Sequence, residues 1–278
     1  MESQPLPHRE PLVDFSFIVP MRNNADDLRR SLDSICAEAP ASSEVVVVDG
    51  SDTPIGKDTV RQMLGCSHVE LVYTRDDKTG VFGAMNVGVA ATRGRWLVMM
   101  PGGDLVNTGA RSLLESVNDS TLDAVVFAQD MATPEGGRLY SFAPTSRTIW
   151  PHHSVVLRRT VHERHGLYPV RYRYSADQQF FADVRRHIRF EMRPDILTTF
   201  LLGGLSSSAT WRLSKELFEL RRKLGHSVAS SFFRAYITPH VRHWIERRTG
   251  YGGVATRIRI ALMRDYRGGS DQQREVNP

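Results

Sequence analysis

Residues 44–52 read EVVVVDGSD, four consecutive valines followed by a polar segment that opens with Asp49. An unbroken run of β-branched residues is typical of a parallel strand that helices cover on both faces. Two further apolar runs resemble it: residues 15–19 (FSFIV) stop at Pro20, and residues 96–100 (WLVMM) stop at Pro101. Proline cannot donate a backbone hydrogen bond to a neighbouring strand. Each run is therefore predicted to be a buried strand that ends where its polar or proline segment begins.

Helical patterns separate these strands. The first follows Asn24, a suitable N-cap residue, and its apolar positions are 28, 32, 35 and 39. Two more helices are predicted at residues 83–92 and 113–117, and two more strands at residues 69–73 and 124–128. Strands that alternate with helices indicate βαβ units. We therefore predict an α/β fold, a Rossmann-like and mostly parallel sheet with helices on both faces.

The second half of the chain alternates less clearly. We predict a hairpin strand at residues 138–142, a helix at 177–187, a late strand at 196–202 and a helical tail. On this basis the chain divides into a main domain (1–208), a basic helical appendage (209–268) and a disordered tail (269–278).

The composition excludes several classes of protein. The chain has 278 residues, of which 41% are hydrophobic and 24% charged, and this argues against wholesale disorder and against a coiled coil. The N-terminal MESQPLPHREP has no apolar core, so no signal peptide is predicted, and no membrane span is found. Cys36 and Cys66 form no metal-ligand pair and no disulfide framework, so nothing requires an oxidising compartment. We expect a soluble, cytoplasmic chain.

The net charge of +5 is unevenly distributed. From residue 209 onward the sequence has 14 Lys and Arg against 6 Asp and Glu, so the excess of positive charge lies in the tail. A basic tail fits nucleic acid, an anionic membrane surface or a solvated helix face. Its arginines accompany wide apolar stripes, which fits either an interfacial helix on anionic lipid or a helical appendage packed on the domain.

Acidic residues follow several predicted strands, at the edge where such sheets bind ligands. Asp104 follows two glycines and could hold Mg²⁺ or Mn²⁺ together with substrate phosphates, or could simply close a tight turn. Asp49 and Asp52 could accept hydrogen bonds from a base or a ribose, or could form an Asx-turn. Asp177 could be a general base, or a charge in the first turn of a helix.

Two other polar features precede and follow Asp177. His152 and His153 are adjacent and point in different directions on regular structure, so one buried, hydrogen-bonded histidine is a simpler interpretation than a shared metal ion. Gly203 and Gly204 offer backbone N–H groups that could contact phosphate, although a flexible loop explains them equally well.

The order of these segments resembles a known family. FSFIVPMRNN, EVVVVDGSD, GVFGAMNVGVAATRGRWLVMMPGGD and the later HHSVVLRRTVHERHGLYPVRYRYSADQQFF, over residues 14 to 208, are similar to the inverting glycosyltransferases of family 2. Within that family they look like the bacterial enzymes that build cell-surface polysaccharides and glycolipids. The resemblance implies a GT-A fold and a nucleotide-sugar-dependent glycosyltransferase of the hexosyltransferase type, acting on a glycan or lipid-linked acceptor.

The resemblance also implies roles for individual residues. Asp177 would be the catalytic base and Asp104 the ligand of Mg²⁺ or Mn²⁺. His152, His153 and Arg158 would lie on the acceptor side or be structural. The residues implied in nucleotide binding are Pro20, Asn23, Asp49, Ser51, Asp52, Asn86 and Gly103. The basic tail would hold the enzyme at an anionic surface, on the inner face of the cell membrane, and no nucleic acid is expected as a partner.

The sequence departs from the family pattern at several positions. The metal motif has one carboxylate, Asp104, where many relatives have two, and Gly83 replaces the usual acid before Ala84-Met85-Asn86. Val87 and Lys78 are further departures. These departures leave open a catalytically weakened protein that binds a nucleotide sugar or acts as a scaffold. A sugar nucleotidyltransferase is a second alternative, because it also needs an α/β sheet and a metal-held diphosphate.

Overall fold

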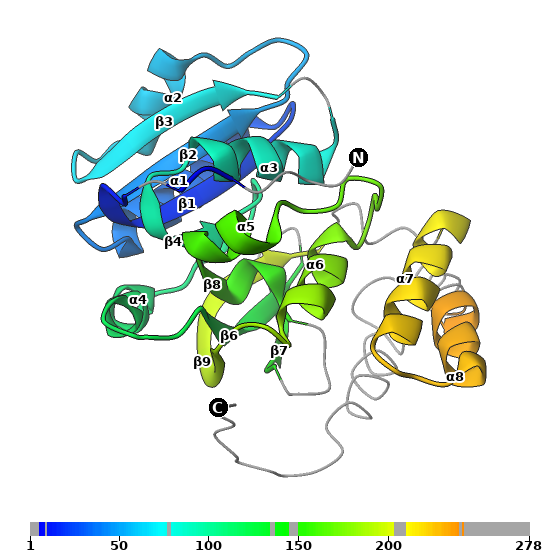
Figure 1. The fold of residues 1–278 in the computed structure, drawn as a ribbon. Helices are drawn as coiled ribbons and strands as arrows, with labels where there is room; N and C mark the ends of the chain where they lie inside the picture. The colour runs from blue at the N-terminus through cyan, green and yellow to red at the C-terminus, as the bar shows by residue number, and fades with distance from the viewer. Residues whose placement is uncertain are drawn as a thin grey trace.

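The computed structural model describes residues 6–8, 10–76, 79–133, 137–144, 150–202, 210–238 and 241. These residues form one nine-stranded sheet in the order β3-β2-β1-β4-β8-β6-β9-β5, with β7 paired to β6. Helices cover both faces of the sheet, as predicted (Figure 1).

The first half of the chain builds a parallel sheet. Each of its helices connects two successive strands. In chain order the elements are β1 (Val13–Met21), α1 (Ala25–Glu38), β2 (Ser43–Asp49), α2 (Lys57–Leu64), β3 (Val69–Arg75), α3 (Val81–Ala91) and β4 (Gly94–Met99). The pairs β1–β2, β1–β4 and β2–β3 are all parallel. All the strands and helices predicted in this half are therefore present, although β1 continues through Pro20, which pairs in register with Val48.

The apolar strands have both faces buried because side chains alternate across them. Val45 and Val47 belong to one core cluster together with residues of α1 and α2, whereas Val46 and Val48 belong to a second cluster together with residues of α3. All four valines are 0% exposed. The absence of a polar residue among these four valines is thus explained by helices on either side of the strand.

The second half is more mixed. Its short β8 lies between β4 and β6 and is antiparallel to both, and β9 is parallel to β6. The elements are β5 (Leu105–Val106), α4 (Ala110–Asn118), β6 (Ala124–Ala132), β7 (Arg138–Phe142), the 3₁₀ helix η1 (His152–Ser154), β8 (Val155–Arg158), α5 (Arg159–His165), α6 (Ala176–Val184) and β9 (Phe190–Leu201). The fold class is the predicted one. The sheet is parallel in its first four strands and mixed beyond them.

Helices follow the sheet domain, as predicted. α7 (Trp211–Lys223) lies against α6, and α8 (Val228–Phe232) and the π-helix η3 (Phe233–Ile237) lie against α7 (Figure 1). Leu213 and Leu220 of α7 are buried. Half of the predicted basic appendage (209–268) and all of the predicted disordered tail (269–278) lie outside the described residues. None of the described helices is both long enough and apolar enough to cross a membrane.

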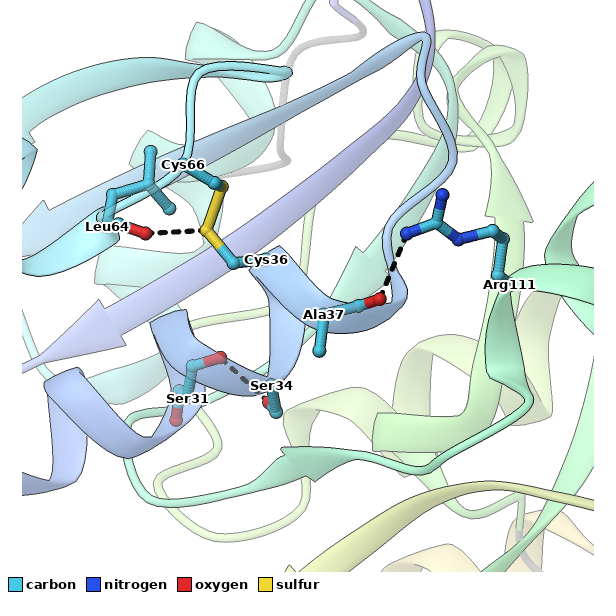
Figure 2. Close-up of a disulfide and its surroundings, with 7 residues drawn as sticks. All are labelled: Ser31, Ser34, Cys36, Ala37, Leu64, Cys66 and Arg111. Atoms are coloured by element: carbon cyan, nitrogen blue, oxygen red, sulfur yellow. Dashed lines mark hydrogen bonds between the residues drawn. A yellow bond between two sulfur atoms is a disulfide. The ribbon is translucent and has the colours of Figure 1, made fainter.

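The structure corrects the expectation for the cysteines. Cys36, near the end of α1, is joined to Cys66, just beyond α2, by a disulfide across 30 residues of sequence (Figure 2). The two cysteines meet because α1 and α2 pack side by side on the same face of the sheet. A cross-link that closes a loop of this length stabilises a fold by about 3–4 kcal/mol, chiefly by restricting the unfolded chain.

Candidate functional site

The loop after β4 places Asp104, and a buried serine holds that loop. The hydroxyl group of Ser31 on α1 accepts from the backbone N–H of Gly103 (2.9 Å) and donates to the carbonyl oxygen of Asp104 (2.8 Å). Gly103 has φ +107, and a Cβ there would lie 3.3 Å from the carboxyl carbon of Asp27. A residue with a side chain would be strained in this turn. Helix α1 therefore fixes the position of the loop.

The Asp104 carboxylate is buried and only partly satisfied. Its Oδ1 accepts from the backbone N–H of Leu201 at the end of β9 (3.0 Å), and its Oδ2 lies 3.2 Å from Nδ1 of His153. Burial raises the pKa of Asp104 well above its usual value. The hydrogen bond from Leu201 opposes that rise, and the nearby charge of Asp27 adds to it. A positive charge beside Asp104 would favour its ionised form.

A divalent cation fits the chemistry of this position. The buried Nδ1 of His153 has no hydrogen-bond partner, and burial lowers the pKa of that histidine to about 3, so its ring is neutral and has a nitrogen facing Asp104. Within the described residues no three His, Cys, Asp or Glu side chains form a complete metal cage. An ion at Asp104 would therefore need oxygen atoms from a bound ligand, as Mg²⁺ often does with phosphates.

Asp177 lies in the first turn of α6. Its Oδ2 accepts from Nε2 of Gln178 (2.9 Å) and lies 3.7 Å from Nδ1 of His152, and its side chain is 13% exposed. Burial raises the pKa of Asp177 to about 6, although the hydrogen bonds with Gln178 oppose the rise. A carboxylate with such a pKa is ionised at neutral pH and is a stronger base than an ordinary aspartate.

Two consecutive histidines connect the two acids. His152 is next to Asp177 and His153 is next to Asp104, with their ring centroids 5.8 Å apart. His152 is held by a hydrogen bond between its Nε2 and the hydroxyl group of Tyr168 (3.0 Å), and His153 stacks on Phe200. His152 is the one buried, hydrogen-bonded histidine that the sequence suggested, whereas the side chain of His153 is 14% exposed. Asp104 and Asp177, far apart in the sequence, thus belong to one constellation.

The loops after β1 and β2 form a second part of the site. Asn23, a non-glycine residue with φ 54, exchanges two hydrogen bonds with Asp52: its Nδ2 donates to Oδ2 (2.8 Å), and its Oδ1 accepts from the backbone N–H (3.0 Å). Its own N–H donates to the hydroxyl oxygen of Ser51 (2.9 Å). The carbonyl oxygen of Pro20 accepts from the N–H of Gly102, which ties these loops to the Asp104 loop. The structure therefore brings these four sequence-predicted residues together.

Of the two alternatives for Asp49, a ligand contact or an Asx-turn, the structure shows the hydrogen bond of an Asx-turn, from the N–H of Ser51 to Oδ1 (2.8 Å). Asp49 is 1% exposed, and its oxygens accept from the N–H groups of Ser51 and Ile55 and from the hydroxyl group of Tyr73, while Arg75 lies 3.2 Å away. Burial disfavours the charged form, but the hydrogen bonds from Ser51 and Tyr73 outweigh it and lower the pKa of Asp49. The carboxylate thus organises the loop and is already occupied by protein donors.

Asn86 and Arg158 also have structural contacts. The amide of Asn86 on α3 exchanges two hydrogen bonds of 2.9 Å with the backbone of Tyr168, so its donor and acceptor are engaged by the protein. Arg158 stacks on Trp96 at 4.4 Å and donates to the carbonyl oxygen of Leu122. It pairs with the start of β4, at the opposite end of that strand from Asp104, which supports the structural alternative for this arginine.

Sequence reasoning missed several residues of this region. Ser31 holds the Asp104 loop, and Tyr168 positions His152. Asp76, which follows β3 and is 5% exposed, accepts from the hydroxyl group of Thr79. Its place directly after a strand, like that of Asp49, was an available signal. Glu216 of α7 accepts from the backbone just before α6, and no sequence pattern indicates this contact. Gly203 and Gly204, for which a phosphate contact and a flexible loop were equally open, lie outside the described residues.

Comparisons with known proteins agree with the geometry. Residues 16–180 match the model of the family described as Glycosyl transferase family 2. The PGL/p-HBAD biosynthesis glycosyltransferase of Mycobacterium tuberculosis is 27% identical over 210 residues, 70% of this chain and 79% of that protein. The succinoglycan biosynthesis protein ExoO of Rhizobium meliloti is 27% identical over 275 residues, 94% of this chain and 76% of that protein.

Solved structures share the fold. The mannosyltransferase PcManGT from Pyrobaculum calidifontis, in complex with GDP-Man and Mn²⁺, aligns with a TM-score of 0.60 and 18% identity over 95% of this chain and 84% of that chain. TarS of S. aureus aligns with a TM-score of 0.61 and 16% identity over 81% of this chain and 44% of that chain.

Proposed function

The chain belongs to glycosyl transferase family 2 and is a GT-A glycosyltransferase, and from this premise we propose that it moves a sugar from a nucleotide-sugar donor to a hydroxyl group of a glycan or lipid-linked acceptor, with inversion. The observation that carries the proposal is the joined constellation of Asp104, His153, His152 and Asp177. It combines a cation-compatible acid with a second acid whose pKa is raised to about 6.

The chemistry divides between the two acids. As the acceptor oxygen attacks C1 of the sugar, Asp177 takes the hydroxyl proton, and the bond from C1 to the nucleoside diphosphate breaks on the opposite face. A single displacement of this kind inverts the anomeric centre. A divalent cation, when bound, supplies positive charge that stabilises the leaving diphosphate. Asp104 and His153 would hold it, and the neutral His152 leaves the Asp177 carboxylate free to accept the proton.

The donor nucleotide would occupy the loops after β1 and β2. Asn23, Ser51 and Asp52 lie there, linked to the Asp104 loop through Pro20. Asp49 stabilises the loop after β2 by accepting hydrogen bonds from the backbone N–H groups of Ser51 and Ile55. PcManGT is similar to this chain and its structure contains GDP-Man and Mn²⁺, which supports a nucleotide sugar and Mg²⁺ or Mn²⁺ here. The names of the two curated relatives, which refer to PGL/p-HBAD and to succinoglycan biosynthesis, support a cell-envelope glycan or glycolipid as the product.

The stereochemistry of the product tests this proposal. A thermal-shift screen with UDP-, GDP-, dTDP- and CMP-sugars and Mn²⁺ identifies the donor, and proton NMR of the product formed with it then reads the anomeric configuration. An α-linked donor is expected to give a β-linked product. Retention at C1 would contradict the single displacement. Consumption of a nucleoside triphosphate would favour the nucleotidyltransferase, and metal-independent binding with no turnover would favour the scaffold.

The C-terminal helices carry a feature that suits a membrane surface. Large apolar side chains of α7, α8 and η3 are exposed: Trp211 by 73%, Phe232 by 53% and Phe233 by 59%. Arg212, Arg222 and Lys223 lie on α7, the helix that begins with Trp211. Aromatic residues beside basic ones favour binding at an anionic bilayer surface. We propose that this aromatic patch (Trp211, Phe232 and Phe233) and the basic tail hold the enzyme near lipid-linked acceptors, on the inner face of the cell membrane.

The aromatic patch gives a direct test of membrane association. The combined change Trp211→Ser, Phe232→Ser and Phe233→Ser is expected to weaken binding to vesicles rich in phosphatidylglycerol at least tenfold, since each buried aromatic side chain contributes roughly 1.5–3 kcal/mol. Sedimentation with vesicles measures it. Leu12→Ser, at a position 71% exposed elsewhere on the molecule, is the matched control. Equal binding by the triple variant and the control would refute the proposal.

A further inference from the structure

Glu216 is a buried acid on the C-terminal helix α7 that faces the start of α6. It is 4% exposed. Its Oε1 accepts from the backbone N–H of Arg173 (2.8 Å), and its Oε2 accepts from the N–H groups of Tyr174 (2.8 Å) and Ser175 (3.1 Å) and from the Ser175 hydroxyl group (3.2 Å). One carboxylate therefore binds three consecutive backbone donors in the segment that leads into Asp177.

These contacts take the place of the side-chain cap that α6 lacks at its N-terminus. Ser175 is the N-cap residue of α6, but its side chain makes no capping hydrogen bond and donates instead to Glu216. A buried carboxylate is stable only when its oxygens are well paired, and here backbone donors and Arg212, 3.4 Å from Oε1, pair them. The direction in which α6 leaves its preceding loop is thus set by a residue of another helix.

We propose that Glu216 is a positioning residue for the reaction: through the backbone of residues 173–175 it holds α6 in the orientation that points Asp177 at the acceptor hydroxyl. This inference rests on the proposed role of Asp177 as the base. Two further contacts join the same helices: Gln179 donates to the carbonyl oxygen of Glu216 (3.3 Å), and Lys223 pairs with Asp183 (2.6 Å). Because Glu216 lies beyond the family-matched residues 16–180, α7 completes the site from outside that segment.

Glu216 also affects the pKa of Asp177, the proposed base. Asp177 is next to the neutral His152 of η1 and the neutral amide of Gln178, and the un-ionised Tyr168 is near it. Glu216 of α7 contributes a negative charge that adds to the effect of burial in raising the pKa of Asp177. Removing that charge should lower the pKa of Asp177, so that the base stays ionised at lower pH.

Glu216→Gln tests the proposal because glutamine keeps the size of the side chain and removes its charge. We expect kcat to fall at least tenfold, since the amide NH₂ cannot accept from the backbone donors. Nucleoside diphosphate affinity should stay within twofold of the wild type. The acidic limb of the pH profile of kcat should move to lower pH, by roughly half a unit. Glu219→Gln, one turn further along α7, is the matched control and should change none of these quantities.

A second variant separates geometry from charge. Glu216→Asp keeps the charge and shortens the side chain, so kcat should fall while the acidic limb stays in place. The inference is overturned if Glu216→Gln retains wild-type kcat and the wild-type acidic limb. It is equally overturned if kcat and donor affinity fall together with no movement of the limb, as a purely structural role would predict. Asp177→Asn, measured in parallel, tests the proposed function itself. Normal turnover in that variant would show that Asp177 is not the catalytic base.

Discussion

Replacement of Asp177 by asparagine is expected to lower kcat by about 10²–10⁴-fold while the affinity for the nucleotide donor stays roughly unchanged. The amide has nearly the same shape as the carboxylate and keeps an oxygen that can accept the 2.9 Å hydrogen bond from Gln178. It cannot accept a proton from the acceptor hydroxyl. The donor loops and Asp104 are not altered by this change, so the loss should be confined to the chemical step.

Single-turnover kinetics together with calorimetric titration of the donor separates these quantities. Asp119→Asn is a suitable control, because Asp119 is an exposed acid just after α4, outside α6 and the contacts that join α6 to α7. If Asp177→Asn binds the donor poorly but reacts normally once saturated, Asp177 is a binding residue and the base lies elsewhere. In the wild-type enzyme, turnover should decline as the pH falls through about 6, since protonation of Asp177 removes the base.

Replacement of Asp104 by asparagine is expected to abolish the dependence of donor binding on Mn²⁺. The asparagine oxygen can still accept from the backbone N–H of Leu201, as Oδ1 of Asp104 does at 3.0 Å, so the loop that Ser31 holds should stay folded. The negative charge that would hold a cation is lost. In the presence of Mn²⁺ the Kd for a nucleoside diphosphate should rise at least tenfold, because metal sites that stabilise phosphate charge contribute several kcal/mol.

Titration of the nucleoside diphosphate with and without Mn²⁺ measures this difference. Asp26→Asn, in the exposed first turn of α1, is a control because it changes the net charge by the same amount as Asp104→Asn. Near-normal turnover and an unchanged metal effect in Asp104→Asn would show that the cation, if one is used, is held by other groups.

Much of the fold could be predicted because each strand and helix of the first half is encoded by a short, continuous stretch of sequence. The valines of β2 and the helical spacing after Asn24 each identify one element, and parallel order follows from their alternation. β8 was missed because it has only four residues and inserts between strands that precede it by dozens of positions. The Cys36–Cys66 disulfide could not be read from spacing, since it depends on how α1 and α2 pack.

The site was predictable in part for a related reason. Asp104 follows the apolar strand at residues 96–100, and Asp177 begins the predicted helix at 177–187. These neighbouring elements indicate where each acid lies in the fold. What each carboxylate touches is a property of the folded molecule: Asp49 is occupied by protein donors, whereas His152 and His153 each reach a different acid. Glu216 was invisible in the sequence because it is one acid in a basic helical segment, and only the docking of α7 on α6 gives it partners.

In crystals grown with Mn²⁺ and a nucleoside diphosphate, the anomalous scattering of manganese would show whether Asp104 binds the cation in the same site that Asp177 faces. We expect one strong peak bonded to a carboxylate oxygen of Asp104 and to the diphosphate, with the carboxylate of Asp177 facing the same bound molecule. A peak held by other side chains, with Asp104 still contacting only Leu201 and His153, would contradict this expectation.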